Sequence, residues 1–426
     1  MPFDSGRVSF CRFKVSGDGP TQVDDLALAT LSDHAFRESQ VGAPDEVESG
    51  WITGQHLYDT QFSYEKNGFG TPSRPLLLAA VRLDTHRVPS EVKRSYKQMH
   101  ENALREQSPS GQLSRAQRRE AAELAARQTH EELAAGRYRR SRRVPVLWDL
   151  REGVVLCGNA SAAVAEHLQR LFQDSFALKL TRLTSGTLAG DWLLAKGRTR
   201  DYEDLLPSAY TAPPPEAGPD HEEEDAPRDV QTPLVSWTTG ATDLKDFLGN
   251  ELLIWLWHLT ESAQGAVKVG RNAKASELSV LIDRALDMDC AWDARGRMSL
   301  RGAGPSRLPE AGEALAHGKW PRKAGLTLTG EAGELYEFTL QAERLDVSSA
   351  QLPPIEDVQT PREFLERRLD SILTLATLLD QVFHAFLERR VGEGWPAKRE
   401  AIREWIRDRR RPARSSRREA SAAASA

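Results

Sequence analysis

Cysteines and long apolar runs are both scarce in this chain of 426 residues, which has three cysteines. Cys11, Cys157 and Cys290 are odd in number and far apart. They predict neither a disulfide framework nor a thiolate metal site, and we interpret them as core thiols. The most apolar stretch, residues 247–259, falls short of the roughly 18 to 20 residues that a membrane-spanning helix needs. The first residues lack a signal-peptide pattern, so we expect a cytosolic protein.

Catalytic and nucleotide-binding motifs are missing as well. Residues 312–320 resemble a phosphate-binding loop, but five residues separate Gly312 from Gly318, and Trp320 stands where Ser or Thr would hold magnesium. His130 lacks the second histidine of a zinc-protease motif, and no Gly-x-Ser-x-Gly elbow occurs. The sequence therefore predicts no enzyme, no cofactor and no metal site. A magnesium-dependent nuclease is the enzyme alternative, and no clustered carboxylate motif supports it.

The charges of the chain are distributed unevenly. The net charge is −5, yet Lys and Arg outnumber Asp and Glu fifteen to eight between His86 and Arg151, and ten to four from Lys398 onward. The acidic residues gather in the Pro-rich residues 213–229. Such asymmetry is typical of a surface that binds a polyanion. An interaction scaffold that binds an acidic protein partner would use the same charges, and it stays open as the alternative.

Composition also divides the chain into four expected segments. Residues 1–200 form an N-terminal α/β region with basic helices and a hairpin, and residues 236–392 form an α+β region that ends in a long helix. Between them, residues 201–235 are too acidic and Pro-rich to build a core, which predicts a flexible linker. Residues 393–426 are a basic tail that we expect to be disordered beyond about Pro412.

Hydrophobic periodicity predicts the elements of the first half. Alternating and apolar runs indicate strands at 8–16, 74–83 and 176–183 and a hairpin over 143–158. One helix begins at Pro89 and Ser90, and a second follows the capping-box pair Ser114 and Gln117. A third begins at about Ser161. Its apolar face consists of Val164, Leu168, Leu171 and Phe172. Strands and helices in this order predict that this half is mixed α/β, and we expect an α+β fold for the chain as a whole.

The second half has two distinctive helices. Residues 247–259 are apolar nearly all round, which is typical of a buried helix. Hairpins are expected at 290–302 and 325–341. Thr360, Pro361 and Glu363 then combine an N-cap, a first-turn proline and a capping-box partner. The helix that follows has a narrow apolar seam, which suits either an intradomain contact or a dimer contact. The seam consists of Leu365, Leu369, Ile372, Ala376, Leu379, Phe383 and Phe386.

The order of these segments resembles the RdgC family of bacterial recombination-associated proteins. The resemblance rests on "ESGWITG" (48–54), on residues 74–98, on the two basic helices and on "VLWDLREGVVLCGNASAAVAEHLQRLF" (146–172). It resumes at residues 286–302 and 313–341 and in the final long helix. It covers most of the chain except roughly residues 200–275 and those after 392.

The resemblance implies a non-enzymatic protein that binds double- and single-stranded DNA with little sequence preference. It also implies a homodimer that closes into a ring, association with the nucleoid and restraint of RecA-dependent recombination. The segment 200–275 departs from the family as an insertion. The family's polar hairpin tip towards DNA here contains arginines with Gly and Pro residues between them. The arginines that would take the place of its lysines are Arg295, Arg297, Arg301 and Arg307.

A second arginine cluster precedes the predicted strand that contains Trp148. Its members are Arg137, Arg139, Arg140, Arg142 and Arg143. Arginines at the start of a strand are held by rigid backbone yet exposed, which suits forked contacts with DNA phosphates. A solvated basic loop is the simpler interpretation. The resemblance adds a third one, in which this region is near a dimer contact anchored by Tyr138.

Overall fold

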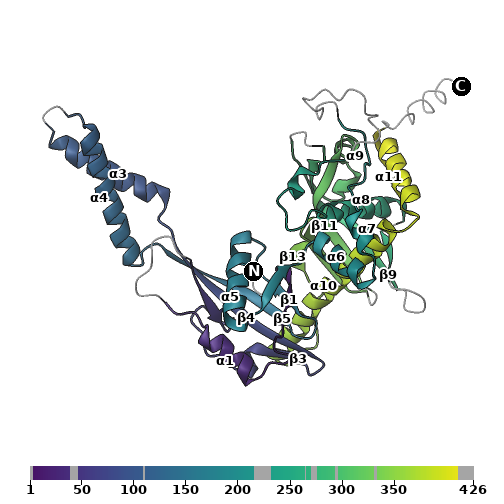
Figure 1. Ribbon diagram of the computed structural model, residues 1–426, viewed down its shortest axis with the longest axis horizontal. Helices are drawn as coiled ribbons and strands as arrows, with labels where there is room; N and C mark the ends of the chain where they lie inside the picture. The colour runs from purple at the N-terminus through teal and green to yellow at the C-terminus, as the bar shows by residue number, and fades with distance from the viewer. Residues whose placement is uncertain are drawn as a thin grey trace. The chain divides into compact units, whose positions relative to one another are not determined.

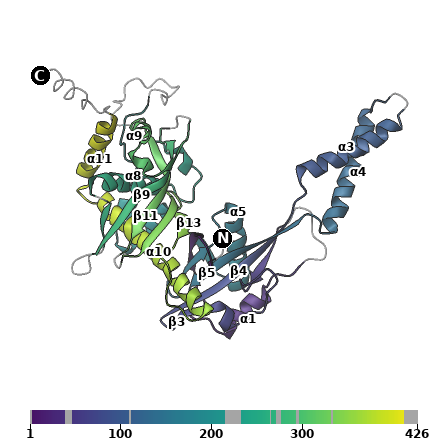
Figure 2. The ribbon, with the colours of Figure 1, turned by 180° about the vertical axis from the view of Figure 1, so that it is seen from behind.

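The computed structural model describes residues 3–38, 47–108, 111–214, 232–263, 265–269, 276–292, 296–330 and 333–410. Within these ranges the chain has eleven α-helices and thirteen β-strands, and the strands pair antiparallel wherever their register is defined. The predicted α+β class is confirmed. The chain divides into two compact units (Figures 1 and 2). We name Val15–Leu180 the inserted unit, and Met1–Lys14 with Thr181–Ala426 the terminal unit.

These units follow the packing of the chain, and the four-segment organisation expected from composition stays a prediction. The three cysteines are buried, as predicted. None of the helices within the described ranges combines the length and the hydropathy that crossing a membrane requires.

The inserted unit contains an antiparallel sheet in the order β6-β5-β4-β2, and β3 also pairs with β4. The predicted strand at 74–83 and the hairpin over 143–158 are confirmed by β4, β5 and β6. The strands are β2 (Val47–Ile52), β3 (Gly68–Thr71), β4 (Arg74–His86), β5 (Arg139–Asp149) and β6 (Val154–Cys157). The two short helices are α1 (Asp25–Asp33) and α2 (Tyr64–Asn67).

Helix α5 (Ala162–Phe176) supplies the core of the inserted unit, and its N-cap is the predicted Ser161. The predicted apolar face is buried. Phe172 of this helix makes edge-to-face contacts with Trp51 of β2 and Trp148 of β5, with ring centroids 5.4 and 5.1 Å apart. The indole of Trp51 donates a 2.9 Å hydrogen bond to Ser175 Oγ. These aromatic contacts fix β5 and therefore the arginines that precede its buried part.

Helices α3 (Ser90–Glu106) and α4 (Arg115–Ala134) form a helical hairpin, shown in Figure 1, that connects β4 to β5 in the sequence. The capping box of Ser114 and Gln117 is present as predicted. Helix α3 has no buried residue, whereas α4 buries the small side chains of Ala121, Ala125 and Thr129. The two helices pack against each other through this narrow contact.

The terminal unit contains a sheet in the order β10-β9-β11-β12-β13-β1, with β8 also paired to β9. Both predicted hairpins are confirmed, because β9 pairs with β10 and β11 with β12. The strands are β1 (Val8–Ser16), β8 (Ala266–Val269), β9 (Ser276–Cys290), β10 (Met298–Gly302), β11 (Lys319–Thr329), β12 (Leu335–Gln341) and β13 (Asp346–Gln351). β7 (Lys179–Arg182) spans the boundary between the units in sequence.

Helix α8 (Phe247–Ser262) is the buried helix that the sequence predicts, and its first twelve residues are all buried. It packs against β9 and β11. Gly249 permits a close approach, because a Cβ at this position would stand 1.8 Å from the carbonyl oxygen of Ala342. The other helices of this unit are α6 (Ser185–Ala195), α7 (Thr199–Glu203), α9 (Pro309–Ala316), α10 (Pro361–Arg390) and α11 (Trp395–Arg410).

Helix α10 begins as predicted, with the Thr360 side chain accepting a hydrogen bond from the backbone N–H of Glu363. Its seam is buried apart from the half-buried Leu365. Further buried residues, among them Leu375 and Val382, widen the seam into a broad apolar face. Other residues of the same chain pack against this face. The intradomain interpretation therefore holds, and the seam is not available as a dimer contact.

The expected linker is more ordered than composition predicts, and the expected tail begins with a helix. The expected linker includes residues 201–214, where the backbone N–H of Ser208 donates a 2.6 Å hydrogen bond to buried Glu251. Arg390 binds the same carboxylate at 2.6 Å and also the carbonyl of Leu206. The expected tail begins with α11, which buries Trp395, Ile402 and Ile406. The rest of the linker and of the tail, residues 215–231 and 411–426, lies outside the described residues.

Candidate nucleic-acid interface

The arginines at the start of β5 alternate between two faces of the sheet, because successive strand residues point to opposite sides. Arg139 is on the same face as Asp84 of β4, which is fully buried. Its Nε donates a 2.6 Å hydrogen bond to Asp84 Oδ2. Arg82 binds both oxygens of this carboxylate, at 2.9 and 2.8 Å, and its guanidinium lies 4.1 Å from the ring centroid of Phe36. Arg139 therefore belongs to a structural ion-pair network.

Asp84 is ionised within this network. Burial opposes its charge, but hydrogen bonds from Arg82, Ser141 and Arg139 outweigh burial and hold the pKa of the Asp84 carboxyl below its usual value. Glu38 adds a second carboxylate, 3.0 Å from Arg82 and 3.1 Å from Arg139. These two arginines are already neutralised by the protein, so they are poor candidates for phosphate contact.

Two further arginines of the predicted cluster also have partners in the chain. Arg143 donates hydrogen bonds to the backbone carbonyls of Gly54 and Gln55, the latter at 2.9 Å. Arg137 is exposed but forms a 2.6 Å ion pair with Glu132 of α4. Arg143 therefore joins β5 to the segment that follows β2, and Arg137 is compensated by the end of α4.

Arg140 and Arg142 differ from these neighbours. Both are exposed. Within the described ranges, neither side chain forms a hydrogen bond or an ion pair. Leu83 is opposite Arg142 and Thr85 opposite Arg140 in the sheet register. Arg87 follows β4 directly, and it too is exposed without a partner among the residues that the structure describes. The sequence analysis missed Arg87. Its position directly after β4, the strand that pairs with β5, is the sequence feature that could have indicated it.

Tyr138 closes the base of the helical hairpin. Its hydroxyl donates a 2.6 Å hydrogen bond to Glu132 Oε2, and this bond, reinforced by burial, raises the pKa of Tyr138 well above its ordinary value. Hydrogen bonds from Tyr138 and from Tyr96 of α3 lower the pKa of the Glu132 carboxyl. Tyr138 thus has a role within its own chain. Its role as a dimer contact stays a prediction.

The second predicted arginine group belongs to β10 and the residues around it, in the terminal unit. Arg297 forms a 3.0 Å ion pair with Asp289, and Arg301 binds Asp287 at 2.6 Å. Arg307 is exposed and has no partner among the described residues. Arg295 lies outside the described residues. The first predicted group belongs to the inserted unit and the second to the terminal unit.

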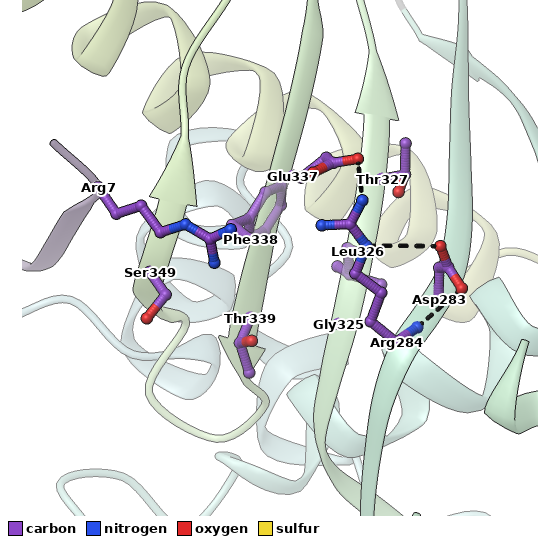
Figure 3. Close-up of a pocket in the computed structure, with 10 residues that line it drawn as sticks. All are labelled: Arg7, Asp283, Arg284, Gly325, Leu326, Thr327, Glu337, Phe338, Thr339 and Ser349. Carbon is purple, nitrogen blue, oxygen red and sulfur yellow. Dashed lines mark hydrogen bonds and ion pairs between the residues drawn. The ribbon is translucent and has the colours of Figure 1, made fainter. Parts of the chain in front are cut away.

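Two cavities lie near β10. One of about 320 Å³ is lined by the carboxylates of Asp287 and Asp289 and by the cations of Arg297, Arg322 and Lys323. A second holds only about 50 Å³, little more than a water molecule. Figure 3 shows Arg284 there, in ion pairs with Glu337 and Asp283. Among the described residues no cluster of three or more His, Cys, Asp or Glu side chains forms a metal site.

Comparisons with known proteins add no identity to this geometry. No family model matches the chain, and no curated protein matches it. The class that the structure itself defines is an α+β protein with exposed, unpartnered arginines beside a helical hairpin.

Proposed function

We propose that this chain is a non-enzymatic protein that binds double- and single-stranded DNA without sequence preference and works as a homodimer in the nucleoid. One observation carries the proposal. Arg140 and Arg142 are exposed and lack carboxylate partners in the described chain, although acidic residues neutralise several other arginines nearby. The likeness of the sequence to the RdgC family adds the proposal that the bound protein restrains RecA-dependent recombination.

The chemistry of these arginines supports affinity rather than specificity. Guanidinium groups bind phosphate oxygens through two parallel N–H donors, and phosphate contacts carry little sequence information. The neighbouring helices α3 and α4 pair some of their own charges, as in Arg94–Glu91 and Arg119–Glu123. These paired charges leave fewer free side chains for reading base edges in a groove.

The proposal is tested by fluorescence anisotropy with two labelled duplexes of unrelated sequence and one single strand. We expect similar affinity for both duplexes and a steep loss of affinity with salt. Each neutralised phosphate contributes about 0.9 to the slope of log K against log salt, so roughly five contacts give a slope of about −4 to −5. A flat salt response, or strong preference for one duplex, contradicts the proposal.

The scaffold alternative makes a different prediction in the same assay. Labelled poly-glutamate represents an acidic protein partner that lacks the phosphate geometry of DNA. Stronger binding of poly-glutamate than of DNA at equal salt would favour the scaffold.

The effect on recombination is tested by RecA-promoted strand exchange. We expect inhibition to follow the occupancy of the DNA by this protein, and the variant Arg140→Gln/Arg142→Gln to inhibit less in proportion to its weaker binding. Full inhibition by a variant that no longer binds DNA would contradict restraint through DNA occupancy.

A further inference from the structure

A cavity of about 550 Å³ opens in the terminal unit, among α8, β8, the end of α10 and the start of α11. Its apolar wall includes Trp255 and Leu259. Three cationic side chains also line it: Lys268, Arg389 and Lys398. Among the described residues no carboxylate belongs to the lining. The cavity therefore combines an apolar surface with uncompensated positive charge.

Among the described residues, the cations of this cavity have no acidic partner. The guanidinium of Arg389 donates to the backbone carbonyls of Ala385 at 2.6 Å and Lys268 at 3.5 Å. Burial lowers the pKa of Arg389, and burial together with the charge of Arg389 lowers the pKa of Lys398. Lys398 Nζ lies 3.4 Å from Nδ1 of His258, whose pKa burial lowers to about 4. His258 is thus neutral at pH 7 and adds no further positive charge beside Lys398.

Trp255 belongs to the apolar wall of the cavity. Its side chain is 1% exposed, and its indole N–H is buried without a hydrogen-bond partner among the described residues, so the ring rather than the N–H is the part of Trp255 that a ligand would contact. The guanidinium of Arg389 lies 5.5 Å from the ring centroid of the same indole, so a cation and an aromatic surface meet at this wall.

We infer that this cavity binds an amphipathic organic anion, whose apolar body packs on Trp255 and Leu259 and whose carboxylate or phosphate head is held by Lys268, Arg389 and Lys398. The volume lies within the range of small-molecule sites in proteins. This site is a further function, and it does not rest on DNA binding at β5.

The test uses the full chain and the fluorescent anion 1-anilinonaphthalene-8-sulfonate, titrated at pH 7. We expect saturable binding at one site per chain. Competition then uses octanoate, monooctyl phosphate and octanol, which share an apolar tail and differ in the head group. We expect either anion to displace the dye, and the stronger competitor identifies the head group, whereas octanol displaces it at least tenfold more weakly.

Single substitutions locate the site. Lys268→Gln and Lys398→Gln each remove one cation from the lining, and we expect each to weaken dye binding about tenfold. Lys323→Gln is the matched control, because Lys323 is exposed on β11 of the same unit and does not line the cavity. Thermal melting of every variant verifies that it is folded.

Three results would overturn the inference. The first is equal displacement by octanol and octanoate, since the cavity would then select only apolar surface. The second is unchanged dye affinity in folded Lys268→Gln and Lys398→Gln proteins. The third is displacement by random duplex DNA but not by octanoate or octyl phosphate, which would assign these cations to nucleic acid.

Discussion

Removing the two unpartnered arginines, in the variant Arg140→Gln/Arg142→Gln, should weaken DNA binding by an amount that depends on salt. Two lost phosphate contacts reduce the slope of log K against log salt by about 1.8. Counterion release alone then predicts a loss of about sixtyfold at 0.1 M salt and about twentyfold at 0.2 M salt. Fluorescence anisotropy with a random duplex, repeated at four or more salt concentrations, measures both the slope and the loss.

The control variant is Arg362→Gln/Arg367→Gln, which changes the net charge equally. Both of these arginines are exposed on α10, beside Glu366 and Glu363. We expect this control to alter affinity less than twofold, because acidic neighbours already compensate its charges. Exposed substitutions rarely change stability by more than about 0.5 kcal/mol, so both proteins should melt like the parent. An unchanged slope in the Arg140 and Arg142 variant, or equal losses in both variants, would refute the phosphate contacts.

Three other predictions concern the framework around this surface. Asp84→Asn should destabilise the protein by about 3 kcal/mol in urea unfolding, because it removes the buried carboxylate that both Arg82 and Arg139 bind and leaves the exposed Glu38 as their nearest carboxylate. The pKa of Asp84 is lowered in the folded state, so the parent should lose this stability as pH falls below about 4, whereas the variant should not. Equal acid sensitivity of parent and variant would contradict a stabilising role of ionised Asp84. Tyr138→Ala should dissociate the dimer in sedimentation velocity while Tyr138→Phe keeps it, and a monomeric parent would contradict a dimer contact. Truncation after Arg410 should leave the melting temperature unchanged, whereas truncation after Gly394 removes α11 and should lower it; equal melting would mean that α11 adds no stability.

Local sequence signals predicted the elements well where one pattern decides them. The cap of α10 at Thr360 is set by three neighbouring residues, and the burial of α8 follows from an apolar stretch with no polar face. Helix α11 was missed because its basic composition dominated the reading. Its buried Trp395, Ile402 and Ile406 recur at spacings of seven and four, which is a helical pattern. The basic composition of α11 thus led us to overlook the helical spacing of its apolar residues.

The candidate site was predicted only in part, because the availability of an arginine for phosphate depends on whether the fold places a carboxylate beside it. Arg139 and Arg140 are equivalent in a sequence reading. The register that aligns Thr85 with Arg140 also brings Asp84 to the face of Arg139, and this alignment joins residues 55 positions apart. No local pattern encodes that pairing. Composition located the arginine cluster, and strand alternation separated its structural members from its free ones.

The discontinuity of the terminal unit has a consequence during synthesis on the ribosome. Val8 pairs with Ala350, and Ser9 Oγ accepts a hydrogen bond from the backbone N–H of Ser349, which is 340 residues away. At about 10 residues per second, the first strand emerges roughly half a minute before its partner. The contiguous inserted unit can fold during that interval, while Phe10 and Phe13, which are buried in the finished protein, still lack the rest of their core. Slower translation lengthens this exposure, so it should increase aggregation of the nascent chain.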